Sequence, residues 1–504
     1  MAGIFINTDA LTFFNGDKMN AEGVREDIDF YTLCGGVEAI FFNMNFQRCL
    51  WRSHSREAIW DGVEETPDGQ FLFRGESLRD QKPEPAMLRF VRNAKRFSEN
   101  CPDFFEIRYA YCHEKGVEMW HSMRMNDVHW TPDPDLPQHS GLWQTRHDLW
   151  RCHYRRPYTG YWENMGLDYL KEEVRDYQLA LVREYLEHEC DGLELDWMRS
   201  LPLFRPGMEE IGTDILTEFV RDIRTEADKA AKKFGHRVRI AVRVPRGPLE
   251  TYRMGMDVTT WAREGLVDIV IPSPPHCANN ATHMPLDLWR KLLPSETLLA
   301  PCIEYATLSL PFNGPRIRAD EEIDAGFASS FYHRGADTIY LYNHFRWNGG
   351  FADREAMQRA FGYLGDQGAV DAKARRHITS FSDTENHCEG GRTIVDLPDE
   401  AWGKSVVAFP IDAGGATKGR KAKVIIGGDK AFHAEIRLNG LVCPGLPPDT
   451  PLPTMPTVSK TEFHVSAFEI PDGVLHDGRN TIDIINLDEE GFHPLWAEIA
   501  VEKA

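Results

Sequence analysis

The feature that most constrains the fold is an alternation of strand-like and helix-like segments over roughly the first 370 residues. Short apolar runs alternate with amphipathic runs of helical period, which is the pattern of parallel strands joined by crossover helices. The strand-like runs are residues 3–9, 37–45, 117–127, 192–197, 239–245, 267–274, 298–306 and 338–345. Eight strand–helix units predict an α/β chain with a (β/α)8 barrel, whose usual size is about 250 residues.

The residues in excess of that size lie mainly after the second and third strands. One long insertion runs from Phe46 to about Pro83, and another from Val128 to Leu167. In a barrel of this kind the segments that follow the strands form the catalytic mouth. Both insertions are rich in tryptophan, whose ring faces can cover the apolar faces of a ligand.

After about Gly365 the pattern changes to strands without intervening helices. They lie at residues 405–411, 421–428, 434–443, 461–470, 480–487 and 495–503, separated by turns rich in Gly and Pro. This pattern predicts an all-β, jelly-roll-like sandwich. We therefore divide the chain into a barrel domain at 1–375 and a C-terminal domain at 376–504, with a short helical or linker stretch that ends near Arg376.

The fourth strand holds two acids in the run GLELDW. Side chains on a strand alternate between its faces, so Glu194 and Asp196 point one way while Leu193 and Leu195 point the other. Buried carboxylates are costly unless they have partners. Asp196 falls at the carboxyl end of the strand, where barrel enzymes hold their active sites, so it is a candidate for chemistry.

The same alternation on other strands brings polar groups to the inner face. The residues that it directs inward with Asp196 are Arg124, Asn126, Arg243, Glu304, Tyr340 and Tyr342.

Two parts of the sequence resemble known protein families. The runs SMRMNDVH and DGLELDWMRS, the FRPG that follows, and the strand order resemble glycoside-hydrolase-like TIM barrels of bacterial polysaccharide-degrading loci, over residues 1–375. EIRLNG and LHDGRNTIDIINL resemble strands of the galactose-binding-like β-sandwiches appended to many glycosidases. The resemblance implies a carbohydrate substrate.

The resemblance leaves the roles of the acids open. In retaining families of the largest clan, the strand-four carboxylate is the acid/base and a strand-seven Glu is the nucleophile. In barrels similar to α-galactosidases and α-amylases, the strand-four Asp is the nucleophile. Here Asp196 follows a Leu and not the Asn-Glu pair of the largest clan, while strand seven offers Glu304.

Glycoside hydrolysis needs two carboxyl groups that flank the bond, one protonated and one ionised. We predict Asp196 and Glu304 as this catalytic pair, and Asp127 as a third acid that can replace Glu304. The residues expected to contact substrate are Arg124, Asn126, Asp127, His129, Glu194, Trp197, Arg199, Arg243, His276, Tyr342 and His344.

Several of these residues also have structural interpretations. Glu194 is explained more simply by an ion pair with Arg243 or Arg124, and Asp196 by one with Arg199. A histidine in a loop, such as His129, is commonly a surface residue. Trp197 can be a packing residue, as most tryptophans are.

Composition and the absence of certain motifs argue against several other classes of function. The net charge of −21, without a basic stripe, argues against nucleic acid. No apolar run is long enough to span a bilayer, and no signal peptide precedes the first strand, so we expect no membrane and a cytoplasmic location, or a periplasmic one if a signal was removed. The ten cysteines form no CxxC pair, and free buried thiols fit them best. No metal, phosphate or dinucleotide motif is present, so we predict no cofactor and no metal.

The sequence thus predicts a glycoside hydrolase of oligo- or polysaccharides. The long loops favour exo action, and the arginines near the mouth favour an anionic sugar. Two alternatives stay open: a metal-dependent lyase or aldolase acting on sugar acids, and a carbohydrate-binding barrel without catalysis. The sequence leaves a homo-oligomer open as well.

Overall fold

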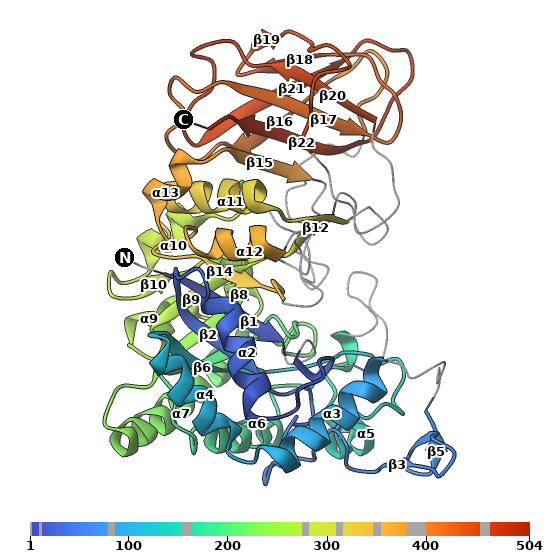
Figure 1. The fold of residues 1–504 in the computed structure, drawn as a ribbon, viewed down its shortest axis with the longest axis vertical. Coiled ribbons are helices and arrows are strands. Elements are labelled where there is room, and N and C mark those ends of the chain that lie inside the picture. Colours follow the sequence, from blue (N-terminus) through green and yellow to red (C-terminus); the bar gives the residue numbers. More distant parts are fainter. Residues whose placement is uncertain are drawn as a thin grey trace.

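The N-terminal part of the chain is a barrel of parallel strands (Figure 1). The computed structural model describes residues 3–9, 13–78, 86–152, 163–274, 282–308, 316–345, 354–380, 400–453 and 464–503. The strand segments of the barrel are β1 (Ile4–Asp9), β2 (Val37–Asn43), β6 (Glu118–Arg124), β7 (Gly192–Asp196), β8 (Arg239–Pro245), β9 (Ile269–Ser273), β10 (Leu298–Leu299), β11 (Cys302–Glu304) and β14 (Tyr340–Tyr342). Their order in the sheet is β10-β9-β8-β7-β6-β2-β1-β14-β11.

The two ends of this sheet are one continuous run of chain, so the sheet closes on itself. β10 and β11 are separated only by Ala300 and Pro301, and proline has no N–H to continue a ladder. On one side, the Ala300 N–H donates to the carbonyl of Val270 in β9 at 2.9 Å. On the other, the Tyr340 N–H of β14 donates to the Pro301 carbonyl at 3.0 Å. Residues 298–304 therefore act as one strand, and the predicted eight-stranded barrel is confirmed.

Helices follow most of the strands and cover the outside of the barrel (Figure 1). They are α2 (Ala21–Thr32), α3 (Ala86–Asn100), α4 (Phe104–Glu114), α6 (Glu172–Tyr185), α7 (Glu209–Phe234), α8 (Pro248–Arg253), α9 (Val258–Arg263), α10 (Leu286–Leu292), α11 (Glu321–His333), α12 (Arg354–Phe361) and α13 (Gln367–Ala372). Outward strand residues such as Leu193 and Leu195 join the large core between strands and helices.

A smaller apolar cluster fills the inside of the barrel. It includes Phe5, Phe41 and Trp120, and the rings of Phe41 and Trp120 stack with centroids 4.7 Å apart. β7 begins with Gly192 because a Cβ there would lie 2.3 Å from the Trp120 ring. These apolar side chains fill the interior of the barrel, and polar side chains lie at the carboxyl ends of the strands.

The long insertion after β2 is fixed to α6 by one buried carboxylate. Glu184 accepts hydrogen bonds from the Ser53 hydroxyl at 2.6 Å, the Trp51 indole at 2.9 Å and the His54 N–H at 3.1 Å. The short strands β3 (Val63–Glu65), β4 (Phe71–Phe73) and β5 (Glu76–Ser77) form a small sheet in the same insertion. The insertion after β6 contains the short helices α5 (Gly141–Thr145), η1 (His147–Leu149) and η2 (Glu163–Met165). After β11, β12 (Ala306–Leu308) pairs with β13 (Arg316–Arg318).

The C-terminal part is an all-β structure of two four-stranded antiparallel sheets, as predicted. One sheet has the order β15-β22-β17-β20 and the other β16-β21-β18-β19. The strands are β15 (Arg375–Ser380), β16 (Val406–Asp412), β17 (Ala422–Gly428), β18 (Ala434–Leu438), β19 (Leu441–Cys443), β20 (His464–Glu469), β21 (Arg479–Asn486) and β22 (Pro494–Val501). The likeness of this part to galactose-binding-like modules stays a prediction.

The short helical or linker stretch predicted to end near Arg376 contains α13, which ends at Ala372, but β15 was not predicted. It begins at Arg375 and pairs with β22 along its whole length. The run RRHITS lacks the alternation of a half-buried strand. Nevertheless Arg375, Arg376 and His377 are all at most 2% exposed. Arg376 is buried against Asp320 and Glu498, which are distant in the sequence, so no local pattern reveals its burial.

β15 lies directly against α11, between the barrel and the rest of the sandwich (Figure 1). Gly326 makes this approach possible, because a Cβ there would lie 2.1 Å from the Arg376 carbonyl oxygen.

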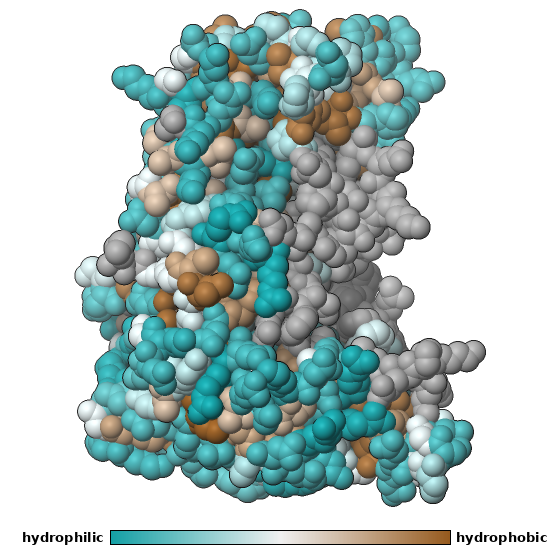
Figure 2. Space-filling model, viewed as in Figure 1, coloured by the Kyte–Doolittle hydropathy of each residue, from teal (hydrophilic) through white to brown (hydrophobic). Residues whose placement is uncertain are grey.

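The surface seen in Figure 2 is mostly hydrophilic, with small separate hydrophobic patches. Among the described residues no helix is long and apolar enough to cross a membrane. The eight cysteines in the described ranges are free, and all except Cys34 are buried.

Candidate active site

Polar side chains from several strands meet at the carboxyl end of the barrel. Arg124, Asp196 and Arg243 stand side by side in the register of β6, β7 and β8. Glu304 stands beside Tyr342 in the register of β11 and β14. All five side chains are at most 2% exposed. The structure thus brings together the two acids predicted as the catalytic pair and three residues predicted to contact substrate.

The Arg243 guanidinium links the two acids. Its Nη1 donates to Asp196 Oδ1 at 3.0 Å and Oδ2 at 3.2 Å, while its Nη2 lies 3.4 Å from Glu304 Oε1. Nε donates to the Ser273 hydroxyl at 3.1 Å, and the guanidinium carbon lies 3.7 Å from the centre of the Tyr342 ring. Both acids are therefore held close together by one planar group.

The two acids differ in their surroundings. Asp196 has both oxygens on Arg243 and also accepts the Met198 N–H at 3.1 Å. Glu304 has a single contact with Arg243 and accepts the Asn343 side-chain amide at 3.1 Å. Burial raises the pKa of Glu304, although Arg243 and Arg199 oppose the rise. The site therefore holds Asp196 through both of its oxygens beside a Glu304 whose pKa is raised by burial.

Glu194 lies one inward position deeper and has neutral partners. It accepts the Tyr340 hydroxyl at 2.5 Å and the Asn7 side-chain amide at 3.1 Å. The predicted ion pair with Arg243 or Arg124 is not what the structure has at this residue. Burial, and next the charge of Asp196, raise the pKa of Glu194 to about 7. Glu194 is thus an acid that can be neutral near neutral pH.

A second charged cluster flanks the pair on the β6 side. Arg124 donates to Asp9 at 2.7 Å and to Asp127 at 3.2 Å, and His129 Nδ1 lies 2.8 Å from the same Asp127. Burial alone would raise the pKa of Asp127, but His129 and Arg124 hold it well below its usual range. Asp127 is therefore suited to orienting His129 and less suited to donating a proton.

Arg199 lies at Tyr342 and not at Asp196. Its Nε donates to the Tyr342 hydroxyl at 3.0 Å, and its guanidinium carbon lies 5.3 Å from the centre of that ring. The structural interpretation that pairs Asp196 with Arg199 is thus replaced by the pair with Arg243.

Three other predicted residues serve the scaffold. Asn126 exchanges hydrogen bonds with the backbone of Leu167, at 3.1 and 2.8 Å. Trp197 is fully buried and packs edge-to-face on Tyr169. His344 lies 3.0 Å from both the Tyr342 carbonyl and the Asp324 carboxylate of α11. These contacts engage the three side chains with the scaffold, although His344 is near enough to act electrostatically on Glu304. His276 lies outside the described residues.

Four site residues were missed from the sequence. Asp9 and Asn7 share one face of β1 by the same period of two that singled out Asp196, so this signal was available. Ser273 ends β9 and was equally readable. Asn343 was not, because it has a left-handed φ of 62° beyond the end of β14, and no alternation predicts its direction.

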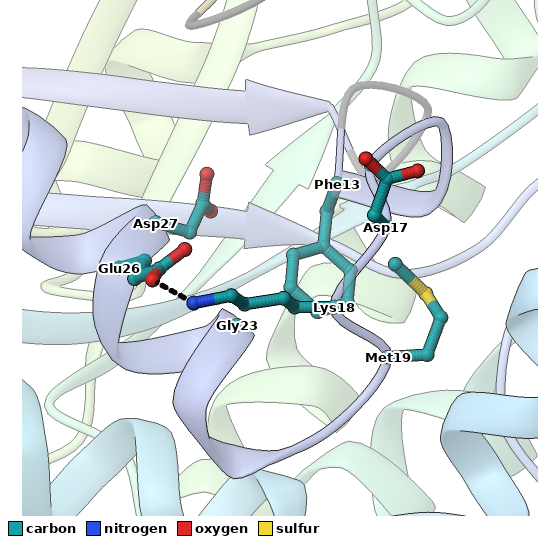
Figure 3. Close-up of a pocket in the computed structure, with 8 residues that line it drawn as sticks. Phe13, Asp17, Lys18, Met19, Gly23, Glu26 and Asp27 are labelled. Atoms are coloured by element: carbon teal, nitrogen blue, oxygen red, sulfur yellow. Dashed lines mark hydrogen bonds and ion pairs between the residues drawn. The ribbon is translucent and has the colours of Figure 1, made fainter.

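Two other features of the structure bear on ligands. In the described ranges, no group of three or more His, Cys, Asp or Glu side chains is placed to hold a metal ion. A hollow of about 210 Å³ lies beside the start of α2, and Figure 3 shows its lining. There the Lys18 ammonium is paired with Glu22 at 2.6 Å and with Glu26. No predicted site residue lines this hollow.

Comparison with known proteins gives a likeness of fold. No family model and no curated protein matches the chain. A chitinase from Paenibacillus sp. str. FPU-7 is similar at 10% identity and a TM-score of 0.42, over 99% of this chain and 56% of that one. An alpha-galactosidase from Thermus thermophilus shares 13% identity, with a TM-score of 0.36 over 75% and 63% of the two chains. An alpha-L-fucosidase from Paenibacillus thiaminolyticus shares 14%, with a TM-score of 0.35 over 96% of each. At these values the likeness assigns no activity, so function is argued from the site.

Proposed function

We propose that this chain is a glycoside hydrolase acting on an oligo- or polysaccharide, with Asp196 and Glu304 as its carboxylate pair. The observation that carries the proposal is the shared contact of both acids with Arg243, at 3.0 and 3.4 Å, at the carboxyl ends of β7 and β11. Glycoside hydrolysis requires two nearby carboxyl groups in opposite protonation states. The different surroundings of the two acids supply that difference.

In this mechanism Glu304 is the general acid and Asp196 the nucleophile or general base. Glu304 gives its proton to the glycosidic oxygen as the bond to the anomeric carbon breaks. Asp196 either attacks that carbon or takes a proton from the attacking water. Arg243 orients Asp196 by hydrogen bonds to both carboxylate oxygens. The anomer of the first product separates the two courses, since direct attack retains configuration and activation of water inverts it.

The experiment that tests the proposal is turnover of a panel of neutral and anionic oligosaccharides by the wild type and Asp196→Asn, with and without EDTA. We expect the variant to lose at least about 10³-fold in kcat/KM on any substrate that the wild type cleaves. Asp191→Asn is a matched control, because Asp191 precedes the same strand and contacts the Met119 N–H and His113 at the opposite end of the barrel. It should retain activity.

Each other outcome favours a different protein. Activity that EDTA abolishes and a divalent metal restores would replace the hydrolase with the metal-dependent lyase or aldolase. Glycan binding without turnover, unchanged in Asp196→Asn, would make the acid pair part of the scaffold of a binding protein. Equal loss in Asp196→Asn and Asp191→Asn would show damage to the strand and not to chemistry.

Exo action on short chains is part of the proposal. It is supported by the two long insertions after β2 and β6, which lie on the side of the barrel that holds the acids. Product analysis tests it: an exo enzyme releases one small product from the first minutes, whereas an endo enzyme first releases a ladder of sizes.

A further inference from the structure

The arginines at the barrel mouth differ in the acidic partners that they contact. Arg124 is paired with Asp9 and Asp127, and Arg243 with Asp196 and Glu304. Arg199 makes no ion pair with any acid in the described part of the chain. Its hydrogen bond from Nε goes to the neutral Tyr342 hydroxyl. The two terminal nitrogens of Arg199 thus make no direct contact with a carboxylate of the described residues.

The position of Arg199 is fixed by its neighbours. The Asn126 N–H donates to the Arg199 carbonyl at 2.8 Å, and the Ser200 N–H donates to the Asn126 carbonyl at 2.7 Å. The side chain is fixed by the Tyr342 ring, which also lies against Arg243. Less side-chain freedom is therefore lost when such a group binds a ligand.

A half-buried guanidinium without a direct carboxylate contact is costly, and this chain has more acidic than basic residues. It carries 78 Asp and Glu against 57 Lys and Arg, and the neighbouring arginines each have two carboxylates. An arginine that contacts no carboxylate beside the proposed catalytic pair suggests that the ligand supplies its anionic partner.

We propose that Arg199 binds an anionic group of the substrate, the carboxylate of a uronic acid or a sulfate ester, on a sugar beside the bond that is cleaved. This inference rests on the proposed hydrolase and names its substrate class. Guanidinium nitrogens match the oxygens of both groups. The net charge of −21 repels polyanions at long range, so their recognition needs a local cation.

The test uses pairs of substrates that differ only in the charge. Oligogalacturonide and oligoglucuronan are compared with their carboxyl-reduced forms, and carrageenan oligosaccharides with their desulfated forms. The proteins are the wild type, Arg199→Met, Arg199→Lys and the control Arg183→Met. Arg183 is an exposed arginine of α6 that pairs with Glu226, so its loss changes net charge equally far from the site.

On the anionic member that the wild type cleaves best, we expect Arg199→Met to lose about 10- to 100-fold in kcat/KM. On the neutral member of that pair, the change should be under about 3-fold, and Arg199→Lys should fall between the two. Arg183→Met should match the wild type on both. The pair that shows the difference identifies the anion as carboxylate or sulfate.

The outcomes separate this inference from the proposed function. If the wild type cleaves a sugar but Arg199→Met loses equally on the charged and neutral members, or on neither, the inference is overturned and the hydrolase stands. If the wild type cleaves nothing, the hydrolase fails, and calorimetric titration with the same pairs decides the inference. Anion-selective binding that is lost in Arg199→Met supports it, and any other binding result overturns it.

Discussion

Buried arginine–carboxylate contacts lie both at the barrel mouth, around Arg243, and where the barrel meets the sandwich, around Arg376. At the junction, Arg376 faces Glu498 with two parallel hydrogen bonds, from Nε at 2.9 Å and Nη2 at 2.8 Å. At the mouth, Arg243 divides its nitrogens between Asp196 and Glu304. The same residue types thus form a closed pair in one place and a shared contact in the other.

The difference distinguishes a structural ion pair from a reactive one. At the junction the third nitrogen of Arg376 binds Asp320 at 2.7 Å, and the Trp496 indole completes Glu498 at 3.0 Å. At the mouth the contact between Arg243 and Glu304 is long, at 3.4 Å, and burial raises the pKa of Glu304. Arg199 contacts the Tyr342 hydroxyl and no carboxylate of the described residues. We interpret the closed Arg376–Glu498 pair as an ion pair that stabilises the fold, and the shared contacts of Arg243 as ones that a substrate can reach.

The largest effect on stability is expected at the junction. Arg376→Met leaves Glu498 buried without its main partner, which should lower the free energy of unfolding by about 3–5 kcal/mol. The kcat/KM of the folded protein should be unchanged, because no mouth residue is touched. Urea unfolding and turnover on the same preparation measure both quantities.

The double variant Arg376→Met, Glu498→Leu is the control. It removes both charges, so it should recover most of the stability lost in the single variant. A double variant as unstable as the single one would show that packing around β15, and not the unpaired acid, caused the loss. A fall in kcat/KM of either folded variant would erase the distinction between the two clusters.

The fold could be predicted from the sequence almost completely, because burial of parallel strands and amphipathic helices leaves a periodic signal. All eight barrel strands and the later strands of the sandwich were located. β15 was missed, since its buried residues include Arg375, Arg376 and His377. The partners of Arg376, Asp320 and Glu498, lie 56 and 122 residues away along the chain. Local periodicity cannot report a strand that is buried through distant ion pairs.

The members of the mouth cluster could be predicted in part and their pairing could not. The period of two placed Asp196, Arg243 and Glu304 on one face. Which arginine meets which acid depends on side-chain geometry across three strands, so Arg199 was expected where Arg243 lies. Trp197 and His344 carried residue types common in sugar sites, and the structure uses both for packing or support.

Glu194 provides the next prediction, which concerns pH. Its pKa is raised to about 7 in the folded protein from 4.5, so between these values the folded state binds more protons than the unfolded state. Stability should therefore fall by about 3 kcal/mol as pH rises from about 4.5 to 7. Glu194→Gln removes this slope, so unfolding free energies at pH 5 and 8 should differ less in the variant than in the wild type.

Glu172→Gln, at an exposed position in the first turn of α6, is the control and should keep the slope of the wild type. A wild type whose stability does not fall over this range would mean that Glu194 stays ionised. The buried mouth would then resemble the junction, with its charges matched.

A smaller effect is expected where α11 and β15 approach. In Gly326→Ala the new Cβ would lie 2.1 Å from the Arg376 carbonyl, so backbone must move, at a cost of about 1–3 kcal/mol. Gly368→Ala in α13 is the matched control, because its Cβ would meet only the Asp366 side chain at 3.3 Å. Alanine there should be neutral or stabilise by up to about 1 kcal/mol. Equal melting temperatures for the two variants would contradict the close packing of the junction.

The smallest effect compares two exposed tryptophans. Trp130 follows the Asp127–His129 contact at the mouth and is 52% exposed with a left-handed φ of 60°, while Trp402 is 65% exposed on the sandwich. If Trp130 covers one face of a bound sugar, Trp130→Ala should raise KM by roughly 2- to 10-fold with kcat nearly unchanged, since such a contact is worth about 0.5–1.5 kcal/mol. Trp402→Ala should leave both constants unchanged. Because both side chains are half-exposed, neither variant should shift the free energy of unfolding by more than about 0.5 kcal/mol. An equal rise of KM in both variants would extend the ligand surface from the mouth onto the sandwich, whereas no rise in either would confine recognition to the buried charges of the barrel.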